Sequence, residues 1–335
     1  MPEVIQRKVQ AGIESSRGTP VAATRILNGV LSPWSIDRNL VWSPVNNGMY
    51  VSRQKGSYTR PVVTTSYSEA ATYEDIAWWL QHTSEGGVTG VSDSGTPNPG
   101  YLYGFDPDLT TDSVKSSTFE CGVPGHVEDF AQVMVDSMTL RIAPDNTSEP
   151  SWMLDAQLKA LGLPSAGTFA SLTVRETEEI RAAGTKIFID DDPANVGTTQ
   201  KTGWLIDASL TFNIMRHFKA FAEDADGFSA GKTGRGERTT DVQITYEFDD
   251  YDEYNDFLSS APVLRAVRLY QEGSIIHSTV RKSIAIDVIG YWATFAESER
   301  EGNITAVMAL QGGLIDATFG NDYKVEVLNG LATLV

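Results

Sequence analysis

The sequence predicts a mainly β protein built from two similar modules in tandem, each a β-sandwich or barrel-forming unit with one flanking α-helix. Short runs of alternating or β-branched residues recur along the whole chain. Clusters of Gly, Pro, Asn, Asp and Ser separate these runs at short spacing. The alternation of strands with long helices that is typical of doubly wound sheets is missing. We therefore expect mainly antiparallel sheets.

Ten segments carry the strand pattern most clearly. Each has period-two alternation or a high share of β-branched and aromatic residues. They are residues 60–67, 133–142, 170–176, 185–190, 204–214, 241–248, 267–273, 283–292, 303–310 and 323–329.

Two segments interrupt the β pattern and are predicted to be helical. In the first, Thr72 can cap the helix with Asp75 at the third position, and Gly86 can end it. In the second, Asp250 is the expected cap, and Pro262 follows the end. Each helix has an apolar stripe at i, i+3 and i+4 that can pack on a sheet. The stripes are Ile76, Trp79 and Leu80, and Tyr254, Phe257 and Leu258.

A fixed offset of 178 residues relates the two helices, since it separates Tyr73 from Tyr251. The segment 8–19 also matches 186–198 once one extra residue is allowed in the second copy. Such an offset predicts an internal repeat, with the alternative that two β domains share only generic turn chemistry. The same offset relates Asp75 to Glu253, Ile76 to Tyr254, Trp79 to Phe257, Leu80 to Leu258, Gly56 to Gly234 and Arg60 to Arg238.

The predicted module boundary is the segment GLPSAG, residues 162–167, because Pro, Gly and Ser gather there. The first β module is expected to span residues 1–162, and the second 163–335.

The charge of the chain is strongly acidic. Its 335 residues include 44 acidic and 26 basic ones, which gives a formal net charge of −18. Such a surface repels phosphates and anionic membranes, so binding to nucleic acid through neutralisation of its backbone is disfavoured. The start MPEVIQRKVQAG has no apolar run of signal-peptide length, and no segment approaches the roughly 20 apolar residues of a membrane span. We expect a soluble protein that is not secreted through a cleaved signal and does not bind a membrane.

Motifs for catalysis are weak in this sequence. GFSAG, residues 227–231, matches the nucleophile-elbow pattern at Ser229 but lacks the preceding strand and following helix. The overlapping GKT lacks the earlier glycine of a phosphate loop, because Asp226 stands there. The single Cys121 is predicted to be a small buried side chain.

Metal sites are also not expected. The histidines at 82, 126, 217 and 277 lie far apart without ligand spacing. The acidic runs 190–193 and 247–256 lack the alternation and central glycine of a calcium loop, so they are interpreted as a solvated turn and helix-capping acids. The sequence predicts no catalytic residue, no cofactor and no metal ligand, and hence a protein that is not an enzyme.

Two clusters of three basic residues stand at equivalent points of the two predicted modules, before a strand in each. One interpretation is a pair of solvated hairpin tips. The other is a pair of basic arms that dock on the acidic surface of a neighbouring subunit and so form subunit and ring contacts. The clusters are Arg53, Lys55 and Arg60 in the first module, and Lys232, Arg235 and Arg238 in the second.

The segment AGIESSRGTPVAATRIL, residues 11–27, resembles the N-terminal region of the tail tube proteins (major tail proteins) of long-tailed bacteriophages. In that family a strand ends in a segment of the type G-x-E-x-x-x-G-T-x-x-x-x-T. The matching residues in this chain are Gly12, Glu14, Gly18, Thr19 and Thr24. The final segment, residues 302–335, is similar to the C-terminal strands of the same family.

The resemblance implies a structural subunit that assembles into rings whose inward sheets form a continuous barrel. The rings stack into a tube that conducts DNA during ejection, without binding it, and other tail proteins contact the tube ends. The protein would lie in the virion, in the phage tail, and in the host cytoplasm during assembly. An acidic wall would repel the phosphates of the passing DNA.

Ring stoichiometry follows from the same resemblance. Most members of the family carry one module and form rings of six. A chain with two modules is therefore expected to form homotrimeric rings with pseudo-sixfold symmetry; the alternative is a hexamer in which one module decorates the exterior.

Two other functions stay open from the sequence. A tail-terminator or baseplate protein would share the module and form a single ring. A β-rich carbohydrate-active enzyme or lectin would use some of the seven tryptophans and many carboxylates.

Overall fold

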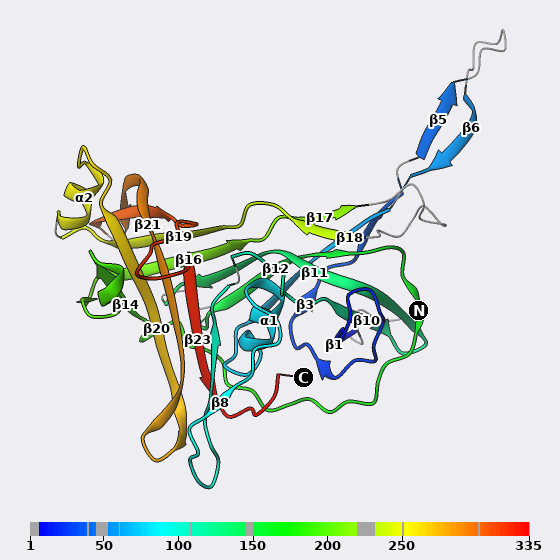
Figure 1. Cartoon of the computed structure of the whole chain (residues 1–335), viewed down its shortest axis with the longest axis horizontal. Helices are drawn as coiled ribbons and strands as arrows, with labels where there is room; N and C mark the ends of the chain where they lie inside the picture. The colour runs from blue at the N-terminus through cyan, green and yellow to red at the C-terminus, as the bar shows by residue number, and fades with distance from the viewer. Residues whose placement is uncertain are drawn as a thin grey trace.

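Antiparallel strands make up most of the chain, with two short helices, as the predicted mainly β class requires (Figure 1). The computed structural model describes residues 7–38, 40–44, 53–59, 61–107, 109–144, 150–219, 232–249, 251–300 and 302–334. Within these ranges, no helix is long and apolar enough to cross a membrane.

The strands and helix of the first half are as follows. They are β1 (Lys8–Ile13), β2 (Arg25–Ile26), β3 (Val30–Leu31), β4 (Ser35–Asp37), β5 (Leu40–Pro44), β6 (Arg53–Tyr58), β7 (Val62–Ala70), α1 (Ile76–Thr83), β8 (Val91–Ser92), β9 (Tyr101–Phe105), β10 (Ser117–Val123), β11 (His126–Ile142), β12 (Met153–Ala160) and β13 (Ser165–Gly167).

The second half continues with the following elements. They are β14 (Lys186–Asp190), the short 3-10 helix η2 (Pro193–Asn195), β15 (Gln200–Lys201), β16 (Leu205–Asn213), β17 (Arg216–Lys219), β18 (Lys232–Arg235), β19 (Thr239–Glu247), α2 (Asp252–Phe257), β20 (Leu264–His277), β21 (Val280–Arg300), β22 (Asn303–Gln311) and β23 (Tyr323–Asn329).

The two halves pair their strands in the same order. In the first half, β1 pairs with β2 and β10, β10 with β11, β11 with β12 and β13, β12 with β7, and β7 with β3 and β4. In the second, β14 pairs with β15 and β20, β20 with β21, β21 with β22 and β23, β22 with β19, and β19 with β16. The β5–β6 hairpin precedes β7, and the β17–β18 hairpin precedes β19. A helix follows each of these two strands, α1 after β7 and α2 after β19.

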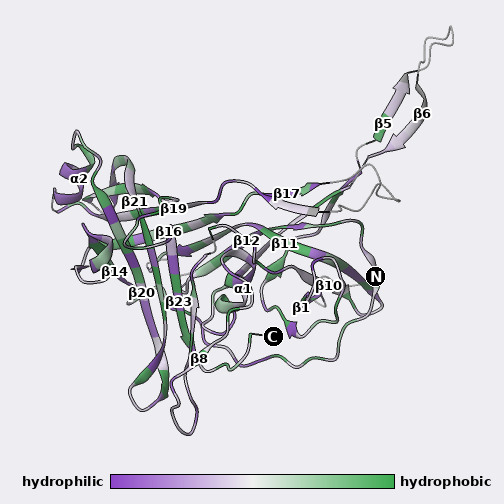
Figure 2. Cartoon of the chain, in the orientation of Figure 1, coloured by the Kyte–Doolittle hydropathy of each residue, from purple (hydrophilic) through white to green (hydrophobic). Residues whose placement is uncertain are grey.

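One continuous layer of sheet runs through both halves. Its order is β4, β7, β12, β11, β16, β19, β22 and β21, with β3 beside β4, and the two halves join where β11 pairs with β16. Alternation along these strands buries one face, as in β7 and β16. Figure 2 shows hydrophobic and hydrophilic residues alternating along the long strands. The layer therefore has one face in the core and one face toward solvent.

The core lies between this layer, the remaining strands and α1. All eight side chains of α1 are buried, including Trp78 and Trp79, whose rings meet edge to face at 4.9 Å between centroids. Trp79 Nε1 donates to Glu69 at 2.6 Å, which satisfies a buried donor. The helix is thus fixed to the buried face of β7.

A buried carboxylate shapes the turn after β1. Glu14 accepts hydrogen bonds from Gly18 N at 2.8 Å, Ser116 Oγ at 2.6 Å and Gln132 N at 2.7 Å. Gly18 has φ of 80°, a left-handed conformation that favours glycine. Gly18 therefore shapes the turn that follows β1.

A carboxylate also organises the turn after β14 in the second half. Asp190 accepts hydrogen bonds from Gly197 N at 2.8 Å and Thr199 N at 2.9 Å, and Gly197 has φ of 86°. Although burial alone would raise it, the hydrogen bonds from Thr198 and Thr199 hold the pKa of Asp190 below its usual value.

Three expectations about local structure are corrected. Residues 170–176 form no strand; their backbone pairs with no neighbouring strand, and most of these side chains are exposed or half-buried. The first helix begins at Ile76, because Thr72 Oγ1 accepts from Asp75 N at 3.0 Å and forms a turn before it. Among the longer strands, β10 and β12 were not predicted, and neither were most of the short ones. The expected cap Asp250 lies outside the described residues.

Candidate assembly surface

The continuous layer ends in two strand edges. At one end, β4 pairs with β7, and no other described strand pairs with β4. At the other end, residues 292–300 of β21 pair with β22, and no described strand lies on their other side. Edges of this kind can accept another strand.

Both edges are exposed, unlike the equivalent strands inside the layer. Ser35 and Ile36 of β4 are exposed, and so are residues 296–299 of β21. The corresponding part of β11 has alternate buried residues, such as Met138 and Leu140. Residues 296–299 of β21 are thus not covered by a neighbouring strand, whereas the corresponding part of β11 is covered by β16.

The junction between β11 and β16 shows how two such edges join. Thr139 lies opposite Thr211, and their hydroxyl oxygens are 3.0 Å apart. Leu140 lies opposite Leu210, and both are fully buried. A cross-strand hydroxyl pair on one face and an apolar pair on the other stabilise the junction.

The predicted basic clusters lie on two separate hairpins. Arg53 and Lys55 belong to β6, opposite Pro44 and Ser43 of β5. Arg60 lies outside the described residues. In Figure 1 the β5–β6 hairpin projects far from the body, and β17–β18 lies on the same side of the molecule. The structure does not bring the two clusters together within one chain.

The second cluster divides between the hairpin and the body. Lys232 and Arg235 are the end residues of β18, opposite Lys219 and Arg216. Arg238 follows the hairpin and pairs within the chain, because Nε and Nη2 donate to the carboxylate of Asp322 at 3.0 and 2.5 Å. Both side chains of this pair are nearly buried. Arg238 therefore stabilises the fold of its own chain.

The base of the β17–β18 hairpin is tied to the first half of the chain. Arg216 is buried, and its Nη1 lies 2.6 Å from Asp112 Oδ2. Arg17 Nη1 lies 2.8 Å from the same oxygen. Despite the burial of Asp112, hydrogen bonds and charges from the two arginines hold its pKa below the usual value. This triad fixes the direction in which the hairpin leaves the body.

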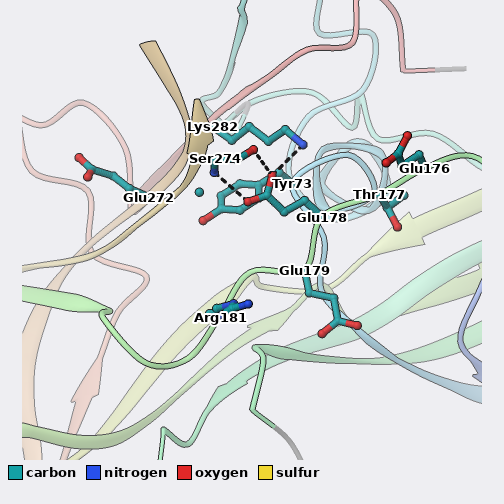
Figure 3. Close-up of a pocket in the computed structure, with 10 residues that line it drawn as sticks. Tyr73, Glu176, Thr177, Glu178, Glu179, Arg181, Glu272, Ser274 and Lys282 are labelled. Atoms are coloured by element: carbon teal, nitrogen blue, oxygen red, sulfur yellow. Dashed lines mark hydrogen bonds and ion pairs between the residues drawn. The ribbon is translucent and has the colours of Figure 1, made fainter. Parts of the chain in front are cut away.

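A polar cavity of about 830 Å³ lies between residues 176–181 and the β20–β21 hairpin. Figure 3 shows Glu178, Ser274 and Lys282 converging beside Tyr73. Lys282 Nζ lies 2.9 Å from Glu178 and 2.6 Å from Glu74, and Ser274 N donates to Glu178 at 2.7 Å. The hydrogen bonds that Lys282 makes raise its pKa although burial opposes this shift. These contacts attach the β20–β21 hairpin to residues 176–181, the segment that passes over the first half of the chain.

Three buried titratable groups lie near α1 and β1. Burial raises the pKa of Glu69 to about 7 and that of Cys121 to about 12, and it lowers the pKa of His82 to about 4. His82 Nε2 and Ser117 Oγ are 2.6 Å apart, and Nδ1 lies 2.8 Å from Trp78 O. All three side chains are packed in the core, and Glu69 also borders a small pocket beside Asn28 and Thr177.

Residues considered for chemistry in the sequence do not converge. In the described ranges, no group of three or more His, Cys, Asp or Glu side chains is arranged to hold a metal ion. Ser229 and the whole GFSAG segment, residues 227–231, lie outside those ranges, whereas Lys232 and Thr233 of GKT belong to β18. Trp78, Trp79, Trp152, Trp204 and Trp292 are buried, so they offer no stacking surface to a sugar.

Comparison with known proteins identifies no relative: no protein-family model matches the sequence, and no curated protein is similar to it.

Sequence reasoning missed the partners that hold these surfaces in place. Asp322 is 84 residues from Arg238, and Asp112 is 104 residues from Arg216. A lone aspartate in a polar segment gives no local signal of such a pairing. The edges of the layer were also missed, because alternation indicates the two faces of a strand and not its neighbours.

Proposed function

We propose that this protein is a structural subunit of a bacteriophage tail tube, in which copies join edge to edge into rings that stack around a conduit for DNA. The single observation that carries the proposal is the continuous layer, joined internally at β11 and β16 and ending in two exposed edges. Edge pairing between copies would remove both edges. The resemblance of residues 11–27 to tail tube proteins supports the same function.

The repeated order of pairing supports a duplicated module. In each half, the same sequence of strands leads from the turn after the first strand, through a projecting hairpin, to a helix. We infer that β11–β16 is the internal form of the junction that β21 and β4 make between chains. The corresponding register places Glu297 opposite Ile36, and Ser298 opposite Ser35, of the next copy.

The dimensions of such a ring suit a conduit. With strands about 4.8 Å apart and tilted by about 40°, three layers of this kind close a barrel about 50 Å across between backbones. That is wider than a DNA duplex. The bulkier side of the layer, which carries α1 and the other strands, fits on the outside, where the circumference is larger.

The solvent face of the layer would then form the wall of the conduit. It carries many hydroxyl and amide groups, and its arginines pair with carboxylates, as Arg141 does with Asp155 at 2.7 Å. We therefore propose a polar wall with paired charges, which offers phosphates few free cations to bind. Among the hydroxyl and amide groups on this face are Ser66, Gln157, Thr139, Thr211 and Gln243.

Proline substitutions on β21 test the edge. Successive residues of an antiparallel strand present their N–H groups to alternate sides. One of Glu297→Pro and Ser298→Pro therefore removes an outward N–H, and the other disrupts the pairing with β22. We expect the wild-type chain to form rings in electron micrographs. The variant that loses only an outward N–H should keep the thermal stability of the wild type and remain monomeric.

The proposal fails if the wild-type chain stays monomeric at high concentration, or if both proline variants form rings as the wild type does. Single rings without tubes would favour the alternative of a tail-terminator or baseplate protein.

A further inference from the structure

The residues around α1 and α2 that correspond at the offset of 178 differ sharply in exposure. Tyr73 is 1% exposed, whereas its counterpart Tyr251 is 62% exposed. Leu80 in α1 is 0% exposed, whereas Leu258 just after α2 is 59% exposed. The two helices follow equivalent strands, so something that covers the first is missing from the second.

The second half of the same chain is what covers α1. Tyr323 Oη donates to Ser84 Oγ at 2.8 Å, just after the helix. Asn329 Nδ2 donates to Tyr73 O at 2.8 Å, just before it. Gly273 in β20 packs so closely on the Tyr73 ring that a Cβ there would lie 2.6 Å from Cε2. The covering elements are β23 and the β20–β21 hairpin.

An aromatic surface remains uncovered at α2. The Tyr254 and Phe295 rings lie 4.5 Å apart, and the Phe248 and Tyr251 rings lie 5.0 Å apart. Phe295 belongs to the exposed part of β21, so this surface is continuous with the edge of the layer. We name it the α2 seat, formed by Phe248, Tyr251, Tyr254, Leu258 and Phe295.

We propose that the α2 seat binds the β10–β11 hairpin and β13 of a second copy of this chain. These elements hold in the first half the places that β20–β21 and β23 hold in the second. The inference rests on the proposed function, because pairing of β21 with β4 of the next copy brings the first half of that copy beside α2.

The border of the proposed occupant is basic, although the β10–β11 hairpin itself carries Glu128 and Asp129. The β10–β11 hairpin lies beside the start of β1, where Lys8 is opposite Gly122 and is preceded by the exposed Arg7. Asp252, which follows Tyr251 directly in the chain, places an exposed carboxylate at the edge of the seat. Basic residues of one copy would therefore approach acidic residues of the next.

Truncation of the exposed side chains tests the seat. In Tyr251→Ser/Leu258→Ser, we expect the subunit concentration at which half the chains are in rings to rise about tenfold or more, as for central interface residues. Folding should be unchanged, because both side chains are exposed in the single chain. Val174→Ser is the matched control, since Val174 is 68% exposed outside the seat, and it should assemble as the wild type does.

A disulfide identifies the occupant. In Figure 1, α2 and the β10–β11 hairpin lie at opposite ends of the molecule, so cysteines at Tyr251 and His126 can meet only between chains. We expect Tyr251→Cys/His126→Cys to give covalent oligomers on oxidation, and neither single variant to do so.

If wild-type rings form but the serine variant assembles equally well and the cysteine pair gives no cross-link, the α2 seat is refuted while the proposed function stands. If the wild type forms no rings, both are refuted.

Discussion

His82 and Glu69 are buried titratable residues whose effects on stability oppose each other. The pKa of His82 is lowered from 6.5 to about 4 in the folded chain, so the unfolded chain binds more protons between these values. Its contribution to stability is therefore lost as the pH falls from about 6.5 to 4, by about 3 kcal/mol in all. The pKa of Glu69 is raised from 4.5 to about 7, so its contribution to stability is lost as the pH rises from about 4.5 to 7.

Two substitutions separate these effects. We expect the free energy of unfolding of His82→Gln to fall less steeply than that of the wild type as the pH drops below about 6. That of Glu69→Gln should rise more steeply with pH between 4 and 7 than that of the wild type. Denaturant unfolding at several pH values measures both. Parallel pH profiles for the wild type and both variants would contradict the assigned pKa shifts.

Single residues also show where sequence reasoning stops. Gly18 could be predicted to form a turn, because glycine readily adopts positive φ. The carboxylate of Glu14 that organises this turn could not, because its partners Ser116 and Gln132 are more than 100 residues away. Arg238 belongs to a visible basic cluster, and only its contact with Asp322 shows that it serves the fold.

At the scale of elements, alternation predicted most of the longer strands, and acids in the first turn predicted α2. Residues 170–176 have a strand-like pattern but cross the surface beside α1, where Arg175 Nη2 lies 2.7 Å from Asp75 Oδ1. This segment is held by a side-chain ion pair and not by strand pairing. The local sequence pattern cannot distinguish a paired strand from an extended surface segment, because the chain is extended in both.

The two projecting hairpins are the elements to which we assign contacts between rings. Arg53 and Lys55 on β6 and Lys232 and Arg235 on β18 remain the candidates, since Arg238 is paired inside the chain. We expect Arg53→Glu/Lys55→Glu/Lys232→Glu to form rings but shorter tubes, because charge reversal repels an acidic neighbour. Tube lengths in electron micrographs measure the effect. Arg281→Glu is the control. Equal tube lengths for the wild type, the triple variant and the control would show that these basic residues do not contribute to ring stacking.

At the scale of the whole molecule, the net charge of −18 and the mainly β pattern could be read from the sequence, and the 178-residue offset predicted a repeat. The sequence did not show that the two halves share one layer of sheet. That layer depends on the pairing of β11 with β16, between residues about 70 positions apart. Pairing partners at such separation are set by packing of the whole chain.

The central claim is that copies of this chain close into a ring through the edges of this layer. Cryo-electron microscopy of assembled tubes tests it most directly, by counting chains and tracing strands in one ring. The account predicts three chains, pseudo-sixfold density, and β21 of each chain paired with β4 of the next. Six full chains in a ring, or a ring in which β21 and β4 do not meet, would contradict it.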